Sequence, residues 1–269
     1  MAGLDKAETH SNGNGSAATA SAAAAAAKKA EDIRTQAPAT DYAGRLTIVA
    51  ALVLPQLALL AAGQHSGAAQ LSAWYAATAA NAASFPASPE ILLGLLMFLP
   101  ERFLYTFVWV APKKYTEVLS KLGDGPLYEP IEFLFSGFVI CKALQIGAFV
   151  QLYFRCGAPP MWDGYASLWQ VVTGLSLVTV GQVLNTWIYL AIGKKGVYYG
   201  CRLGAEIPWV SGRPFSLCPY HPQYVGAFMT VLGGCIGCAT LQHCEKGWFA
   251  LCAGQLVSYV YMGAVEQYL

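Results

Sequence analysis

Charged side chains are scarce in this sequence: only 12% of its 269 residues are Asp, Glu, Lys or Arg, whereas 56% are hydrophobic. With a mean hydropathy of +0.44, the chain cannot cover its apolar surface as a water-soluble globule. Its net charge of +1 supplies no basic field, which argues against a nucleic-acid partner. We therefore expect a protein whose partner is the membrane.

The sequence also lacks a disulfide framework and a convincing metal motif. Its eight cysteines are scattered, mostly in or beside apolar runs, unlike those of a small secreted domain. Cys235 and Cys238, followed by His243 and Cys244, have the ligand types of a zinc site and part of its spacing. Two of these cysteines fall in an apolar run, where free cysteine acts as a small hydrophobe, so we predict no metal site.

Polar and apolar segments divide the chain into three parts. Residues 1–42 are rich in Ala, Ser and Gly and have no apolar face to bury, which predicts a disordered tail. Residues 43–90 add an N-terminal span, Leu46 to Ala62, and a loop without Lys or Arg. Residues 91–269 hold the remaining apolar runs.

Four of those runs are long enough to be helices across or deep into a bilayer: Ile131 to Phe154, Leu168 to Ile192, Tyr224 to Gln242 and Trp248 to Val265. Pro100-Glu101-Arg102 interrupts the run from Ile91 to Val110, which is either a span containing an ion pair or a pair of interfacial pieces. We expect an all-α integral membrane protein, a multi-span helical bundle with a C-terminal helical hairpin.

Basic residues predict the orientation, because Lys and Arg are retained on the cytoplasmic side. They alternate between the connections, and only Arg155 and Lys246 lie on the opposite side. The cytosolic set is Lys28, Lys29, Arg34, Arg45, Lys113, Lys114, Lys121, Lys194, Lys195, Arg202 and Arg213. Lys142 lies inside an apolar run, where it either satisfies neighbouring carbonyl groups or binds a lipid phosphate.

The polar, glycine-punctuated segment 196–226 is where chemistry could be done. Pro222 suits the first turn of a helix, and His221 precedes it at the capping position. The two C-terminal runs match in length at about 27 to 29 Å each as helices. A hairpin of these runs would return Glu266 to the side of His221 and Tyr224.

Short motifs in and around this segment form a recognisable set: Gly181-Gln182-Val183-Leu184-Asn185, Gly196-Val197-Tyr198-Tyr199-Gly200, Ile207-Pro208-Trp209-Val210, Pro214-Phe215 and Pro222-Gln223-Tyr224-Val225-Gly226, with Glu266 near the end. With these motifs, the region resembles the plant-type phospholipid N-methyltransferases. The resemblance extends over nearly all of residues 91–269, which we interpret as a membrane methyltransferase core. More distantly, His-Pro-x-Tyr-x-Gly followed by a terminal acid is similar to isoprenylcysteine carboxyl methyltransferases.

The resemblance implies S-adenosylmethionine as methyl donor and phosphatidylethanolamine-derived lipids as acceptors, at the endoplasmic reticulum, with a multi-pass enzyme whose site faces the cytosol. It implies phosphatidylcholine as the product of methylating the monomethyl and dimethyl lipids. The residues it implies for the donor are Gly181, Asn185, Gly200, Pro222, Gly226 and Glu266. We expect catalytic roles for His221, Tyr224 and Glu266, and lipid contacts from Arg202, Arg213, Tyr198 and Trp209.

Each assignment has a structural alternative. Arg202 and Arg213 would also occur as ordinary cytosolic cations. His221 could serve only as a helix cap, and Glu266 could be a solvated helix end. Tyr198 could be an interfacial aromatic, and Gly200 could serve tight backbone geometry. For the whole chain, the alternatives are a prenylcysteine carboxyl methyltransferase and a non-enzymatic scaffold, although no internal repeat supports transport. The oligomeric state is left open.

Overall fold

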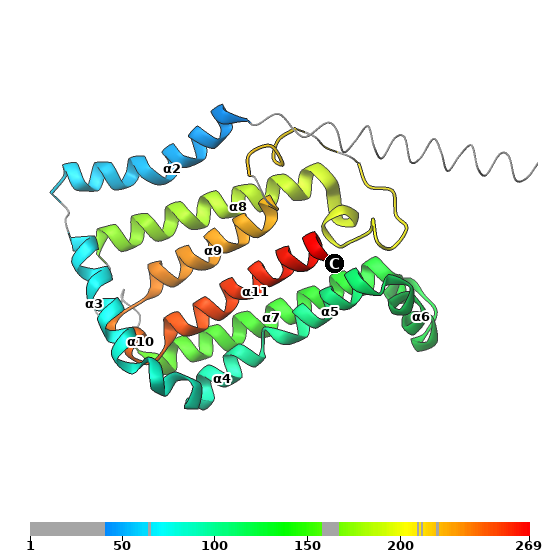
Figure 1. Cartoon of the computed structure of the whole chain (residues 1–269), viewed down its shortest axis with the longest axis horizontal. Coiled ribbons are helices and arrows are strands. Elements are labelled where there is room, and N and C mark those ends of the chain that lie inside the picture. The colour runs from blue at the N-terminus through cyan, green and yellow to red at the C-terminus, as the bar shows by residue number, and fades with distance from the viewer. Residues whose placement is uncertain (1–40, 64–65, 158–166, 209, 211, 219–220) are drawn as a thin grey trace, which may run out of the picture. The chain divides into compact units, whose positions relative to one another are not determined.

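The computed structural model describes residues 41–269, apart from 64–65, 158–166, 209, 211 and 219–220. In that part of the chain every regular element is a helix (Figure 1), which confirms the expected all-α architecture. Nearly all of the predicted tail, residues 1–40, lies outside the described residues. The elements are α2 Tyr42–Ala61, α3 Ser66–Asn81, η1 Ala82–Ala87, α4 Pro89–Leu96, α5 Leu99–Val110, α6 Pro112–Leu122, η2 Pro126–Tyr128, α7 Pro130–Cys156, α8 Leu168–Val197, α9 Pro222–Cys238, α10 Leu241–Glu245 and α11 Trp248–Tyr268.

Five segments among the described residues are long and apolar enough to cross a membrane: α2, the combined α4 and α5, α7, α8 and α11. The predicted runs at Leu46, Ile131, Leu168 and Trp248 therefore coincide with candidate spans. The run that the sequence left undecided, Ile91 to Val110, is one such segment of 22 residues, with a short turn between α4 and α5.

Two parts of the expected organisation are wrong. The segment predicted as a loop within 43–90 contains α3, because its small residues let Trp74 pack against Trp169 and Phe249. The run predicted to continue to Gln242 ends as α9 at Cys238. Thr240 then caps the separate helix α10 by accepting from the backbone N–H of His243.

Helices α8 and α9 pack antiparallel with their backbones almost touching. A Cβ atom on Gly181 would clash with the carbonyl oxygen of Gly226, and one on Gly233 would lie 2.7 Å from that of Gly174. Small residues allow this close approach, which gains van der Waals contact where lipid supplies no hydrophobic drive. The two glycine pairs fix the register of α9 on α8.

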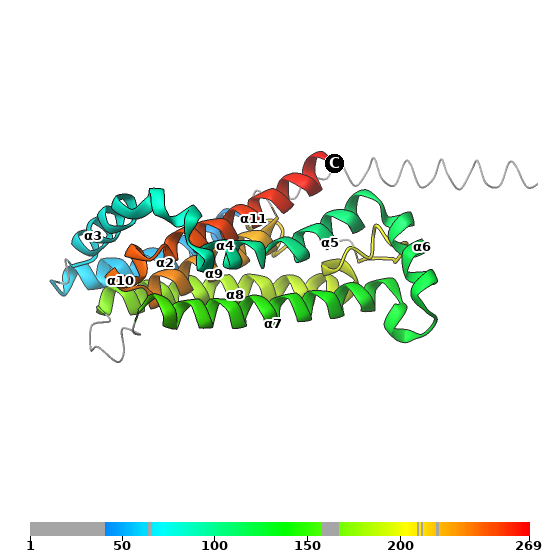
Figure 2. The same ribbon diagram turned by 90° about the horizontal axis from the view of Figure 1, so that it is seen from below.

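Helices α9 and α11 form the predicted C-terminal hairpin. A disulfide links Cys235 to Cys252 near one end, and Tyr224 contacts Glu266 near the other, so the two helices run antiparallel. Helices α4 and α5 pack against α11, and α7 packs against α4 and α5. Figure 2 shows α11 at a different depth from α7 and α8.

Asp41 is the N-cap residue of α2 and stabilises the start of this helix. Its carboxylate accepts from the backbone N–H of Gly44 at 2.8 Å and pairs with Arg213. The Arg213 hydrogen bond and the Gly44 amide hold the pKa of this carboxyl below its usual range. The predicted tail boundary at residue 42 is therefore slightly too late, since Asp41 belongs to the folded part.

We predict that Gly233→Ala destabilises the protein, whereas Gly234→Ala on the same helix does not. The added methyl at Gly233 meets Gly174 and Leu177, and overpacking of this kind costs about 1–3 kcal/mol. A methyl at Gly234 meets nothing within 4 Å, so the higher helix propensity of Ala is kept there. Thermal unfolding in one detergent measures both variants, and equal stability would contradict the proposed role of the contact.

Candidate active site at the C-terminal end of the bundle

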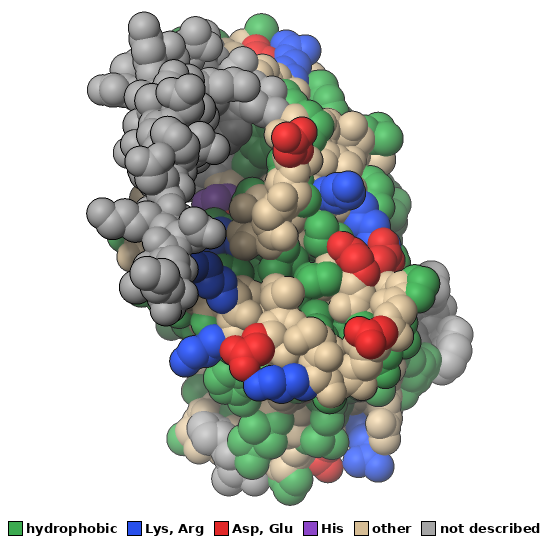
Figure 3. All heavy atoms as spheres, turned by 90° about the vertical axis from the view of Figure 1, so that its right-hand side faces the viewer, with side chains coloured by type: hydrophobic (Ala, Val, Ile, Leu, Met, Phe, Trp, Pro, Cys, Tyr) green, Lys and Arg blue, Asp and Glu red, His purple; other side chains and the backbone are tan. Residues whose placement is uncertain are grey.

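The polar residues of the site gather at the end of the bundle where α8 ends, α9 begins and α11 ends. Figure 1 shows α6, the segment between α8 and α9, and the C-terminus at this end. Figure 3 views this side and shows Lys, Arg, Asp and Glu side chains of both signs among hydrophobic ones, with a histidine in a hollow. The charged side chains distinguish this end from the apolar flanks of the helices.

Glu266 is the centre of this end, and only 7% of its side chain is exposed. Its Oε1 atom accepts hydrogen bonds from two phenols, that of Tyr199 at 2.5 Å and that of Tyr224. His221 Nδ1 lies 3.3 Å from the other oxygen, Oε2. A buried carboxylate needs such partners, because each unpaired charge carries a large desolvation penalty.

Tyr199, which follows α8, reaches this acid because its own backbone is in the left-handed conformation. Helix α8 is already broken at Gly193, which has φ 66° and ψ −177°. Tyr199 has φ 55°, an uncommon conformation for a side chain of its size. Backbone hydrogen bonds hold it there, from Gly200 N to Lys195 O at 2.8 Å and from Arg202 N to Tyr199 O at 2.8 Å. Backbone strain of this kind is common at functional sites.

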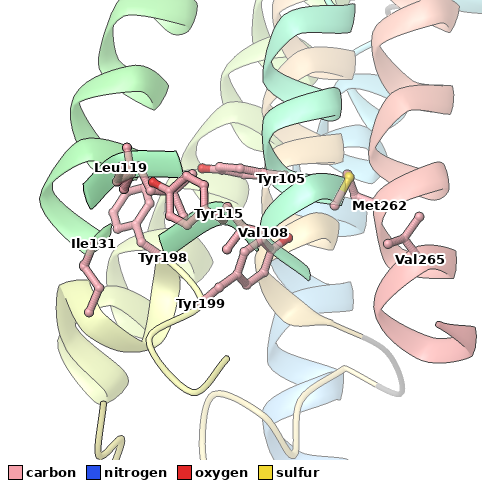
Figure 4. Close-up of a cluster of buried hydrophobic side chains, with 10 residues drawn as sticks. Tyr105, Val108, Tyr115, Leu119, Ile131, Tyr198, Tyr199, Met262 and Val265 are labelled. Atoms are coloured by element: carbon pink, nitrogen blue, oxygen red, sulfur yellow. The ribbon is translucent and has the colours of Figure 1, made fainter. Parts of the chain in front are cut away.

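The turn rests on a buried aromatic and aliphatic cluster (Figure 4), to which α5, α6, α7 and α11 also contribute. The Tyr199 ring packs edge-on against Tyr105 and Trp109, each with a centroid distance of 5.3 Å. Burial raises the pKa of the Tyr199 phenol well above its usual range, and the neighbouring Tyr224 and Glu266 act in the same direction. The phenol therefore stays protonated and donates to the carboxylate.

A cavity of about 630 Å³ extends from Tyr224 and Tyr198 toward the middle of the bundle. This volume lies within the range typical of ligand pockets. Its lining includes Asn185, whose buried Oδ1 has no hydrogen-bond partner among the described residues. The cavity thus begins at the tyrosine that holds Glu266, and a residue with an unpartnered acceptor, Asn185, borders it.

The cavity opens toward the surface that faces lipid. Ile146 and Val150 of α7 and Tyr189 of α8 line it, and all three side chains are largely exposed. A molecule with acyl chains could enter from the bilayer between α7 and α8 without crossing water. A second cavity, of about 520 Å³, lies on the outer side of α9 and α11 and is lined mainly by apolar residues.

The family comparison concerns this part of the chain. Residues 169–267, which contain α8, α9, the segment between them and most of α11, match the phospholipid methyltransferase family. This segment carries the phospholipid methyltransferase domain. With that domain the chain is an enzyme that transfers methyl groups to phospholipids, and neither a prenylcysteine substrate nor a scaffold role has support from the comparisons.

One relative is a phosphatidyl-N-methylethanolamine N-methyltransferase of Arabidopsis thaliana. It is 28% identical over 153 residues, which make up 57% of this chain and 82% of the relative. No solved structure matches the chain.

The structure brings the three predicted catalytic residues together. Glu266 contacts both His221 and Tyr224, as the hairpin predicts. His221 lies at the N-cap position of α9, but its side chain makes no capping hydrogen bond and faces Glu266 instead. No contact between Tyr199 and Glu266 was predicted, because the backbone conformation of Tyr199 cannot be read from the Gly-Val-Tyr-Tyr-Gly motif.

The residues predicted for the methyl donor are dispersed. Gly181 and Gly226 are buried against each other between α8 and α9, where they serve helix packing. Asn185 lines the cavity. Gly200 is buried in the turn after α8, where a Cβ atom would lie 2.6 Å from the Lys195 carbonyl oxygen, and Pro222 is buried at the start of α9.

Of the residues predicted to contact the lipid, some line the cavity and others do not. Tyr198 lines the cavity. Arg202 donates from Nη2 to the Trp109 carbonyl at 2.6 Å and stacks on its ring, while Arg213 pairs with Asp41. Neither arginine lines the cavity. Trp209 lies outside the described residues.

The ligands of the alternative zinc motif do not assemble. Cys235 is bonded to Cys252, and His243 forms hydrogen bonds with Thr240 and with the Tyr153 carbonyl. Among the described residues, no three His, Cys, Asp or Glu side chains are grouped as metal ligands.

We predict energetic coupling between Tyr199 and Glu266. Hydrogen bonds to charged groups contribute about 1.5–3 kcal/mol, so Tyr199→Phe and Glu266→Gln should show a coupling of that order in a double-mutant cycle. Chemical unfolding in mixed micelles measures it. The exposed pair Thr106 and Tyr261, 3.2 Å apart, is the control and should couple by less than about 0.5 kcal/mol. Coupling as small in the first pair would mean that the bond to Glu266 does not form.

Proposed function

We propose that this phospholipid methyltransferase uses S-adenosylmethionine to methylate phosphatidyl-N-methylethanolamine and its dimethyl product, giving phosphatidylcholine. The proposal rests on the family match of residues 169–267, because this segment supplies Tyr199, His221, Tyr224 and Glu266 together with one wall of the cavity. The name of the Arabidopsis relative supports the choice of the later methylation steps. When bound, S-adenosylmethionine supplies an electrophilic methyl group on a sulfonium.

The residues around Glu266 fit such a donor. Among the described residues only His221 approaches Glu266 Oε2, so this oxygen can accept from the ammonium of the methionine moiety. Asn185 Oδ1 is a buried acceptor that lacks a donor. Ammonium and ribose hydroxyl groups are both donors, and a buried acceptor without one is costly. We therefore retain Glu266 and Asn185 as donor-binding residues, with the backbone around Gly181, Gly200, Pro222 and Gly226 shaping the pocket.

His221 and Glu266 provide the route for a proton. The amine of the lipid must be neutral to use its lone pair, so its ammonium proton has to move to a base. Glu266 is almost enclosed, whereas 46% of the His221 side chain is exposed, and the two lie 3.3 Å apart. The pair thus connects the buried acid with the solvent, and either member can be the first acceptor. The reaction itself depends on holding the reacting groups in line rather than on a covalent intermediate.

We place the enzyme in the endoplasmic reticulum membrane with this end facing the cytosol. The described starts and ends of helices at this end carry Arg45, Lys113, Lys114, Lys194 and Lys195. Cations of this kind are retained on the cytoplasmic side. The orientation agrees with a soluble donor that reaches Glu266 from water and a lipid that enters from the bilayer.

We predict that Glu266→Gln weakens S-adenosylmethionine binding by roughly ten- to a hundred-fold, because a charge-assisted hydrogen bond contributes about 1.5–3 kcal/mol. The test measures the Kd on purified protein by calorimetry. Glu117→Gln is the control, since Glu117 is exposed and its carboxylate pairs, within the described part of the chain, with Lys121 on α6. Identical affinities of Glu266→Gln and wild type would remove Glu266 from the donor site.

We predict that monomethylated and dimethylated lipids are good acceptors and that phosphatidylethanolamine is a poor one. A methylated headgroup is less hydrated and gains more from aromatic walls such as Tyr198. Microsomes of a host without phospholipid methylation, expressing this chain, would receive labelled S-adenosylmethionine with each lipid in turn. Tyr198→Leu should reduce the preference. Tyr224→Leu is less informative, because it also removes a hydrogen bond to Glu266. Equal turnover of the three lipids at matched concentration would refute the preference.

A further inference from the structure

A cluster of charged residues that does not include Glu266 lines the cavity. Glu101 Oε2 lies 2.7 Å from Lys142 Nζ and accepts from Gln145 Nε2 at 2.9 Å. Arg102 is 5% exposed and lies over the Tyr259 ring, 4.5 Å from its centroid. All of these residues line the cavity. They come from α5, α7 and α11, three helices that the sequence separates widely.

The cluster contains two cations and one anion. Lys142 has Glu101 as a close counter-ion, with the Gln145 side-chain oxygen at 3.1 Å as a further acceptor. Arg102 Nη2 is 3.2 Å from Glu101 Oε1, within ion-pair distance. Nevertheless, the buried Nε and Nη2 atoms of Arg102 make no hydrogen bond in the described part of the chain. Guanidinium groups keep their charge inside proteins, so the side chains that line the cavity carry an excess of one positive charge, and Arg102 has buried donors without a hydrogen-bond partner among the described residues.

Such a charge is costly between membrane spans unless a partner meets it. The structural alternative is that Tyr259 and Glu101 alone stabilise the charge of Arg102, without a ligand. A cation–π contact, however, leaves the N–H groups in the plane of the guanidinium without acceptors. The pattern of donors fits an acceptor that carries one negative charge and more than one oxygen.

The position of the cluster fits the headgroup of a lipid. The cavity is open between α7 and α8 beside Ile146 and Val150, where acyl chains can remain in the bilayer. On the other side, Tyr259 adjoins Tyr224, with ring centroids 6.2 Å apart, and Tyr224 donates to Glu266. If the phosphate of a headgroup binds at Arg102, the amine of the same headgroup can extend past Tyr259 and Tyr224 toward Glu266.

We propose that Arg102 and Lys142 bind the phosphodiester of the phospholipid inside the cavity, with Glu101 and Gln145 holding Lys142 in place. The headgroup identity rests on the proposed function; the anion site rests on the cluster alone. One phosphodiester charge neutralises the excess, and its two free oxygens accept from the guanidinium and the ammonium. This assigns the phosphate to the bundle interior instead of to Arg202 and Arg213, which already have partners.

The first experiment measures binding and does not depend on methyl transfer. Purified full-length protein in detergent is titrated with phosphatidylcholine, with diacylglycerol of the same acyl chains, and with inorganic phosphate. The wild type should prefer phosphatidylcholine over diacylglycerol, and Arg102→Gln should reduce that preference by roughly ten- to a hundred-fold. Lys142→Gln should reduce it as well, whereas Arg202→Gln, the control at the rival site, should not change it.

The second experiment separates binding from a structural role. Arg102→Gln leaves the pair of Glu101 and Lys142 balanced, so its melting temperature should equal or exceed that of the wild type in the absence of lipid. With active enzyme, the KM for lipid should rise while the Kd for S-adenosylmethionine stays unchanged. A wild type that binds the lipid but methylates none of the acceptors would refute the proposed function and leave the anion site standing.

Three outcomes would overturn the phosphodiester site. The first is equal binding of phosphatidylcholine and diacylglycerol by the wild type. The second is loss of stability in lipid-free Arg102→Gln, which would make the guanidinium a structural partner. The third is inorganic phosphate displacing phosphatidylcholine at the concentrations at which the lipid itself binds, which would identify a site for free anions.

Discussion

The contact of glycine with glycine between α8 and α9 determines the rest of the site. Because Gly181 meets Gly226 and Gly174 meets Gly233, the two helices approach backbone to backbone and α9 has one register. That register sets the position of Tyr224 at the start of α9, and the hairpin of α9 and α11 then brings Glu266 to it. The turn after α8 completes the arrangement by adding Tyr199. Glycines that resemblance assigns to the methyl donor thus also have a direct mechanical role.

The membrane changes the meaning of each polar residue in this bundle. In water, a carboxylate or guanidinium on a helix needs no explanation, but between spans each one requires partners. Glu266 has two phenols and a histidine, and Glu101 has a lysine and an amide. Arg102 and Asn185 retain unsatisfied atoms, and both line the same cavity. At these two residues a ligand in the cavity can supply the partners that the described residues do not.

Much of the fold could be predicted from the sequence, because apolar runs of span length carry most of the information. The runs at Leu46, Ile131, Leu168 and Trp248 coincide with helices. The matched lengths of the two C-terminal runs also sufficed to place Glu266 beside His221 and Tyr224. Helix α3 was missed because its small, polar composition resembles a loop, and only packing around Trp74 makes it helical.

The interior of the site was less accessible to prediction from sequence. The left-handed backbone at Tyr199 is set by hydrogen bonds with Lys195 and Arg202 that no motif announces. Glu101 and Arg102 were visible as an interruption of an apolar run or an ion pair within it, but Lys142, the further partner of Glu101, is about forty residues away and on another helix. A rule that treats each charged residue inside a span as half of a pair would have searched for that partner.

A charged cluster inside the bundle has a consequence for the chemistry of an amine. A headgroup at the membrane surface remains hydrated and cationic, whereas one drawn between helices loses part of its water. Loss of water disfavours the ammonium form and thereby favours the neutral nucleophile that methyl transfer requires. Binding the lipid by its phosphate within the bundle would therefore assist removal of the proton that His221 and Glu266 can accept.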